Sequence, residues 1–155
     1  MVKISVFRTT TGIRRPSYAA LRSDTIKRVH QKMTIAKYRK HTSEDLVQIV
    51  KSLAIERGQA LEVSDPKRAN LLYKDLANIC REIRSRGVET QRQLLPLLDS
   101  EDVYVRLWVA TCALEFDATR AVPILEEIDQ NGSPLVGFTA GMVLKQWREG
   151  KFHFM

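Results

Sequence analysis

The sequence predicts an all-α protein in which about six helices form three antiparallel pairs, stacked as a right-handed α/α superhelix. Three observations lead to this fold class. Residues that start and stop helices recur from Thr42 onward, the apolar side chains between them follow helical spacing, and the second half contains two similar helix pairs. No segment has the pattern of a β-strand, so a sheet is not expected.

The expected helices are bounded by residues that favour helix ends. Thr42 or Ser43 caps the first helix, Asp65 precedes a proline at the start of the second, and Gly87 follows the second as a stop. Gly58 is a weak point within the first helix. The expected helices cover approximately residues 43–61, 66–86, 90–98, 103–116, 118–131 and 134–150.

The second half of the chain repeats one unit, a short helix followed by a tight turn and a longer apolar helix. The segments Leu94–Leu98 and Ala121–Leu125 align with their prolines 27 residues apart. In the helices that follow, Trp108 matches Phe138 at a distance of 30 residues. Helix pairs repeated in this way are typical of α-solenoids, in which about three pairs are needed for stability.

The first of these units resembles a HEAT repeat. The residues that match the HEAT pattern are Leu94-Leu95-Pro96-Leu97-Leu98-Asp99, Asp102, Val105-Arg106, Ala110 and Leu114. From about residue 42 to residue 152 the chain also resembles a small bacterial family of single-domain HEAT-like proteins of unknown function, with Arg86-Gly87 and Gly150 in matching places. The second unit departs from the pattern, because Val136-Gly137 stands where HEAT repeats have Val-Arg. The resemblance implies a HEAT/armadillo-like fold and, by analogy, a macromolecular partner.

The excess positive charge is confined to the N-terminal part of the chain. Residues 1–32 contain eight Lys or Arg and one acidic residue, whereas residues 33–155 contain 17 basic and 17 acidic residues. We therefore expect a basic, mostly disordered arm over residues 1–41 and a helical domain over residues 42–155. The arm fits several interpretations: an inert tail, a tail that contacts nucleic acid or acidic lipid, a transit-like segment, or an extension upstream of a natural start at Met33.

The sequence contains no pattern typical of a catalytic or metal site. His30, His41 and His153 are scattered, and no nucleophile-elbow or phosphate-binding glycine pattern occurs. Cys80 and Cys112 lie in helical patterns without CxxC spacing, as is typical of the buried, reduced thiols of a cytoplasmic protein, and nothing favours a disulfide. No cofactor, no membrane span and no enzymatic activity are expected.

Apolar side chains on the fourth and sixth helices predict a protein-binding surface. They occupy helical positions that polar neighbours indicate should face water, and exposed aromatic residues are favoured binding anchors. The candidate residues are Tyr104, Trp108, Leu135, Phe138 and Met142. We therefore expect a non-catalytic protein-interaction module, such as a cognate inhibitor or an adaptor, and self-association stays open. Burial of these side chains beneath the first helix pair or the arm is the alternative.

A basic stripe on the second helix gives the alternative function. Lys67, Lys74 and Arg81 recur at seven-residue intervals with Arg84 beside them. With the arm, they could contact the phosphates of a nucleic acid. A solvated helix face is the simpler explanation, because the domain is neutral overall.

Three other residues are expected to have structural roles. Arg106 should bond the turn acids Asp99 or Asp102, or neighbouring carbonyl groups. Gly137 and Gly141 lie within one helix, where each costs about 1 kcal/mol relative to alanine. They should allow the close approach of a neighbouring helix, a partner backbone or a symmetry-related copy.

Overall fold

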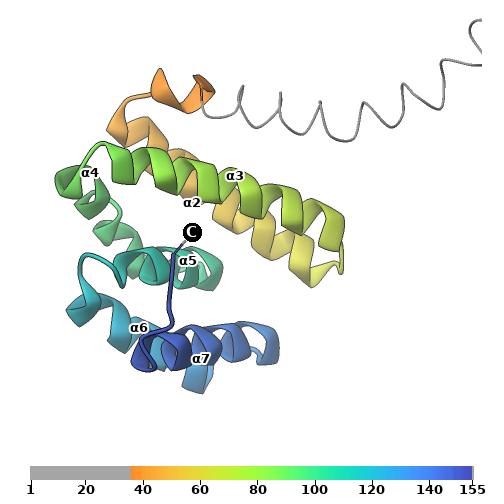
Figure 1. The fold of residues 1–155 in the computed structure, drawn as a ribbon. Coiled ribbons are helices and arrows are strands. Elements are labelled where there is room, and N and C mark those ends of the chain that lie inside the picture. The colour runs from red at the N-terminus through yellow and green to blue at the C-terminus, as the bar shows by residue number, and fades with distance from the viewer. Residues whose placement is uncertain (1–35, 155) are drawn as a thin grey trace, which may run out of the picture. The chain divides into compact units, whose positions relative to one another are not determined.

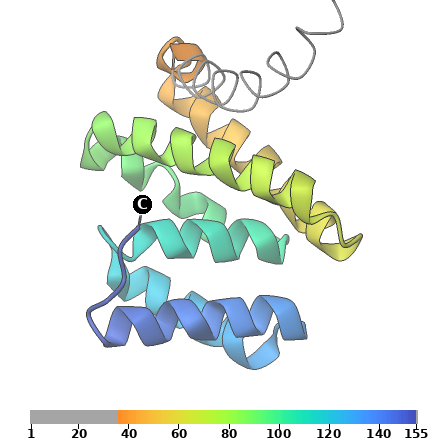
Figure 2. The same ribbon diagram turned by 45° about the vertical axis from the view of Figure 1, so that its right-hand side comes forward.

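The described part of the chain, residues 36–154 of this computed structural model, contains helices and turns and no β-strand, which confirms the all-α prediction. The helices are α2 (Ser43–Glu62), α3 (Pro66–Ser85), α4 (Val88–Arg92), the 3-10 helix η1 (Leu95–Asp99), α5 (Val103–Ala113), α6 (Ala118–Asn131) and α7 (Pro134–Arg148). Helix α2 packs on α3, α5 on α6, and α6 on α7. Figures 1 and 2 show three successive layers: the α2–α3 pair with α4 beside the end of α3, then η1 and α5, then the α6–α7 pair. The handedness of the predicted superhelix stays a prediction.

Side-chain caps explain where the long helices begin. The Thr42 hydroxyl accepts a hydrogen bond from the Asp45 backbone N–H at 3.1 Å, and the Asp45 carboxylate accepts one from the Thr42 N–H at 3.3 Å. Asp65 accepts from the Arg68 N–H at 3.0 Å, and Asp102 accepts from two N–H groups of α5 at 2.9 and 3.1 Å. The predicted caps at Thr42 and Asp65 are confirmed. A cap of this kind contributes about 1 kcal/mol, so these residues fix the register of their helices.

The expected single helix over residues 90–98 is wrong, because two short elements occupy this region. Helix α4 ends at Arg92 and the 3-10 helix η1 begins at Leu95. Pro96 has no N–H to donate, its ring clashes with the carbonyl four residues earlier, and it disfavours α geometry at Leu95. The next helix also ends earlier than expected, at Ala113 instead of Phe116. Two successive N–H groups, those of residues 116 and 117, bond to the Ala113 carbonyl at 3.1 and 2.7 Å and close the turn there.

The hydrophobic core runs through all three layers and is densest around α5. Helix α5 contacts α2, η1, α6 and α7. The side chains that are fully or almost fully buried are Leu46, Val50, Leu76, Ile79, Ile83, Leu94, Val105, Val109, Leu114, Leu125, Ile128 and Val136. Every long helix contributes to this set, and a second, smaller cluster of Ala60, Ala69 and Leu72 lies within the α2–α3 pair.

The packed unit begins at Tyr38, upstream of the boundary at residue 42 that the sequence suggests. The Tyr38 side chain is only 4% exposed and belongs to the core. The Arg86 guanidinium at the end of α3 donates to the carbonyls of His41 and Tyr38 at 2.8 and 3.1 Å. These contacts fasten the start of the unit to α3. The predictions for the arm, including the Met33 start, concern residues 1–35, which lie outside the described residues.

Three glycines lie where another element comes very close. A Cβ atom added at Gly58 would lie 2.2 Å from the Tyr104 ring, so Gly58 allows α5 to approach α2. An added Cβ at Gly141 would lie 2.6 Å from the Asp129 carboxylate, and one at Gly137 would lie 3.1 Å from the Asp129 carbonyl. The close approach predicted for Gly137 and Gly141 is therefore confirmed, with the neighbouring helix α6 as the occupant. Gly58 costs helix propensity, but it makes the α2–α5 contact possible.

Replacement of Gly58 tests this contact. In an ordinary helix position Gly58→Ala would raise stability by about 1 kcal/mol, because alanine has the higher helix propensity. Here we expect a loss of about 1–3 kcal/mol in the free energy of unfolding, since the new methyl group overlaps the Tyr104 ring. Urea denaturation measures the change. In a Tyr104→Ala background the same substitution should cost much less, and a stability gain from Gly58→Ala alone would contradict the contact.

The pH dependence of stability tests the burial of Tyr38. Burial, assisted by the negative charge of Asp75, raises the pKa of Tyr38 to about 12. Between pH 10 and pH 12 the folded chain therefore keeps the phenol proton while the unfolded chain loses it. Because loss of the proton favours the unfolded chain, the free energy of unfolding is highest below pH 10 and falls as the pH rises to 12. Denaturant titrations across this range should show a shallower loss for Tyr38→Phe. Equal slopes for the two proteins would mean that the phenol is hydrated in the folded state.

Candidate functional site

Trp108, a central residue of the predicted protein-binding surface, is buried. Its side chain is 7% exposed. The ring packs edge-on against Tyr73 and Phe154 at centroid distances of 5.6 and 6.0 Å. Its indole N–H donates a hydrogen bond to the Cys80 sulfur at 3.4 Å. The prediction that Trp108 faces water is therefore wrong, because side chains from α3 and from the C-terminal segment cover it.

The C-terminal segment, residues 151–154, folds back along the side of the helical layers. Figures 1 and 2 show it leaving the end of α7, passing α5 and ending between α5 and α3. The Phe152 ring packs against Trp147 at a centroid distance of 6.1 Å. Arg84 donates a hydrogen bond to the Phe154 carbonyl at 3.4 Å. Contacts from α3 and α7 therefore hold the segment over Trp108.

Tyr104 is half-buried in the contact between α5 and α2. Its ring fills the space above Gly58. Burial raises the pKa of the Tyr104 hydroxyl, and the nearby negative charge of Glu62 raises it further. The ring is therefore occupied in packing within the protein and does not stand out from its surface.

The other three candidates form an exposed apolar strip on α7. Leu135, Phe138 and Met142 are 49%, 70% and 40% exposed. Their spacing of three and four residues places them on one side of the helix. The opposite side of α7, with Val136 and Ala140, is buried in the core. We call Leu135, Phe138 and Met142 the α7 strip.

The predicted basic stripe is exposed on α3, but two of its four members make contacts within the protein. Lys67, Lys74, Arg81 and Arg84 are all exposed. Arg81 donates to the Asn78 side chain at 3.1 Å, and Arg84 forms an ion pair with Glu115 of α5. Phosphate binding by these two arginines would compete with these contacts.

Arg106 has a structural role, as expected, but its predicted partners are wrong. Its guanidinium bonds Glu127 of α6 at 3.0 Å instead of Asp99 or Asp102. The reason is that α6 packs along α5, which brings Glu127 across to Arg106. The adjacent Glu126 pairs with Arg148 of α7 at 2.6 Å. These acids thus connect consecutive helices.

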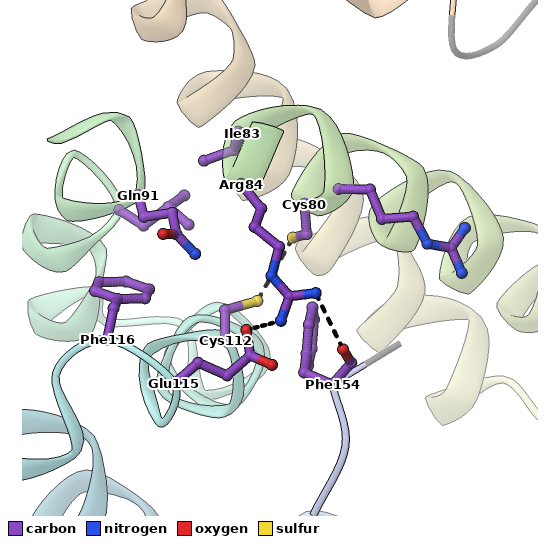
Figure 3. A pocket seen from close by; sticks show the side chains of 10 residues that line it. Cys80, Ile83, Arg84, Gln91, Cys112, Glu115, Phe116 and Phe154 are labelled. Carbon is purple, nitrogen blue, oxygen red and sulfur yellow. Dashed lines mark hydrogen bonds and ion pairs between the residues drawn. The ribbon is translucent and has the colours of Figure 1, made fainter. Parts of the chain in front are cut away.

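A small pocket between α3, α5 and the C-terminal segment contains both cysteines (Figure 3). The Cys80 and Cys112 sulfurs are 3.5 Å apart, and both residues are free thiols. The hydrogen bond from Cys112 is the main factor that lowers the pKa of Cys80, and the Trp108 N–H and the charge of Arg84 also lower it. Burial raises the pKa of Cys112 well above its ordinary value. The two sulfurs therefore differ in their affinity for a proton.

Within residues 36–154 no group of three or more His, Cys, Asp or Glu side chains is placed to hold a metal ion. None of the helices in this range combines the length and the apolar character needed to cross a membrane.

Paired substitutions separate the buried ring from the exposed one. We expect Trp108→Ala to lower the free energy of unfolding by about 3–5 kcal/mol, because it leaves a cavity beneath the C-terminal segment. Phe138→Ala should change stability by about 0.5 kcal/mol or less, since its ring is mostly in water. Chemical denaturation measures both. Equal stability of the two variants would show that the ring of Trp108 does not pack as described.

Comparison with known proteins finds a family model and a solved structure that match this chain. Residues 44–147 match the model of a family described as a domain of unknown function, DUF2019. The crystal structure of the protein RPA1889 from Rhodopseudomonas palustris CGA009 is similar, with a TM-score of 0.70 and 28% sequence identity over 74% of this chain and 94% of that chain. No curated protein matches this chain. Because the matching model is not one for HEAT repeats, the HEAT resemblance stays a prediction. The chain belongs to the DUF2019 family of domains of unknown function.

Proposed function

We propose that this protein is a non-catalytic protein-interaction module that binds its partner through the α7 strip. The observation that carries the proposal is the exposure of Leu135, Phe138 and Met142 side by side on one helix face. An apolar cluster of this kind on a protein surface commonly marks an interaction site. Single exposed apolar residues are ordinary, but three neighbours that include an aromatic ring are not.

Phe138 is the anchor of the proposed surface. It is the most exposed member of the strip, at 70%, and burial of a phenylalanine side chain in an interface stabilises a complex by about 1.5–3 kcal/mol. Leu135 and Met142 lie on either side of it along the helix, and Met142 can adapt its flexible side chain to a partner. A partner with an apolar groove, or with an apolar helix face, fits this arrangement.

The α7 strip replaces the larger surface that the sequence suggests. Tyr104 and Trp108 pack against other parts of the fold and are not contact residues in this proposal. A cognate inhibitor and an adaptor are two roles compatible with such a module. The HEAT-like superhelix is part of the same proposal, supported by the layered helix pairs, because solenoids bind partners along their stacked surfaces.

Nucleic-acid binding is the weaker of the two candidate functions. Arg81 and Arg84 are engaged with Asn78 and Glu115, which leaves Lys67 and Lys74 as the stripe's main phosphate donors. If the stripe bound nucleic acid, affinity for a duplex would fall steeply as salt concentration rises. Duplex binding that is equally weak at low and high salt would exclude it.

The strip is tested by a charge placed at its centre. Phe138→Asp should abolish binding of the partner while the free energy of unfolding changes by about 0.5 kcal/mol or less, because the position is exposed. Leu71→Asp is the matched control, since Leu71 is 63% exposed on α3, away from the strip. A photo-crosslinking residue at position 138 or 71, followed by mass spectrometry, identifies what lies against each site.

The outcomes distinguish the strip from other surfaces. The proposal is supported if the partner crosslinks to position 138 and not to position 71. The Leu135→Asp substitution should then abolish the crosslink at position 138. If both positions crosslink equally, or if Phe138→Asp binds the partner as well as the unmodified protein does, the strip is not the interface. Sedimentation of the purified protein shows whether the partner is a second copy of the chain.

A further inference from the structure

The two cysteines lie in contact although 32 residues separate them in the sequence. Cys80 is on α3 and Cys112 is on α5, and their sulfurs are 3.5 Å apart. A disulfide bond is about 2.05 Å long, so the sulfurs must approach by roughly 1.5 Å to form one. This displacement is within the reach of small side-chain rotations and of a small shift between two helices.

The surroundings of the two thiols are unequal. The Trp108 N–H donates to the Cys80 sulfur at 3.4 Å, and Cys112 shares a hydrogen bond with it. Figure 3 shows the Arg84 guanidinium beside the two sulfurs, ion-paired with Glu115. Burial opposes ionisation of both thiols and the charge of Arg84 favours it in both, so the hydrogen bonds make the difference: those from Cys112 and from the Trp108 N–H lower the pKa of Cys80, whereas the pKa of Cys112 is raised. The thiolate is the reactive form of cysteine, so Cys80 is the sulfur that attacks.

The pocket admits only a small reagent. Its inner space is about 10 Å³, close to the volume needed for one water molecule. Arg84, Glu115 and Phe154 are among the residues that line it. Both sulfurs are buried, so a folded oxidoreductase could not reach them without displacing the residues around the pocket. A small neutral peroxide needs far less movement.

A metal ion explains this pair less well than oxidation does. Structural metal sites of cysteine normally use four ligands, and the described residues offer no group of three that includes these thiols. Two free thiols in contact, such as Cys80 and Cys112, match the reduced form of a couple that interconverts two thiols and one disulfide.

We propose that Cys80 and Cys112 are a modification site, at which hydrogen peroxide oxidises the two thiols to a disulfide that joins α3 to α5.

The Cys80 thiolate attacks one peroxide oxygen, the O–O bond breaks, and the departing hydroxide takes up a proton to become water. The product is a sulfenic acid on Cys80. The Cys112 sulfur then attacks the Cys80 sulfur, the S–O bond breaks, and hydroxide leaves as a second water with the Cys112 proton. In total, two thiols and one hydrogen peroxide give one disulfide and two waters, and a dithiol reductant reverses the change.

The disulfide would lock two layers of the fold together. It closes a loop of 32 residues and links the α2–α3 pair to α5. A crosslink over a loop of this length should raise the melting temperature by roughly 10 °C or more. The proposal does not rest on the function of the α7 strip, because the strip lies on another helix.

The full-length reduced protein tests the proposal directly. It is exposed to hydrogen peroxide while folded, then denatured and alkylated, and its intact mass and peptides are measured. We expect a product that has lost two hydrogen atoms, carries no alkyl groups and yields a peptide pair joined through Cys80 and Cys112. Reduction with dithiothreitol should restore both alkylation sites and reverse the rise in melting temperature. Two cysteines that stay alkylatable, or that become sulfinic or sulfonic acids without a crosslink, would overturn the proposal.

Single variants test the order of the two steps. Cys112→Ser lacks the second thiol and should accumulate a sulfenic acid at Cys80, which dimedone traps when it is added together with denaturant after the peroxide step, whereas Cys80→Ser should give little adduct. Cys112→Ala and Cys80→Ala repeat the comparison without a buried hydroxyl, and circular dichroism verifies that each variant is folded. Trapping of Cys112 in the Cys80 variants, with none of Cys80 in the Cys112 variants, would show that the assigned order is wrong.

Discussion

The burial of α5 on almost every side is the constraint on which the rest of this structure depends. Val105, Val109 and Ala110 are completely inaccessible to solvent, and the helix contacts α2, η1, α6 and α7. Each large apolar side chain removed from water in this way stabilises the fold by about 1.5–3 kcal/mol. The other features follow from this central position. The helix places Tyr104 against α2, Arg106 beside Glu127 of α6, and Cys112 beside Cys80 of α3.

Local sequence signals were sufficient for most of the helix boundaries. Capping side chains, prolines at the first helical position and glycines after the last turn act within a few residues, so one sequence contains the information needed to place them. The error at residues 90–98 has a local cause as well. Pro96 lies in the first turn of the 3-10 helix η1, whereas the aligned Pro123 lies inside α6. The two repeat units therefore differ in structure where their sequences align.

The candidate site was predicted less well, because exposure depends on segments that are distant in the sequence. A helical wheel assigns Trp108 to a face with Thr111 and Glu115, both of which retain some contact with water. It contains no information on Phe154, which reaches this face only because the chain turns back after α7. The contact between Cys80 and Cys112 was missed for the same reason. The apolar character of both positions was visible, but the register between α3 and α5 was not.

The contrast between Trp108 and Phe138 shows why the α7 strip differs from ordinary core. The two residues occupy equivalent places in the repeat, 30 residues apart, and yet one is 7% and the other 70% exposed. Helix α5 has packed elements on both sides, whereas within the described residues no helix covers the outer face of α7. Stacked helical repeats are normally soluble because the outer face of their final helix is polar. Within the described residues, the outer face of α7 instead carries Leu135, Phe138 and Met142 and retains the apolar pattern of an internal helix.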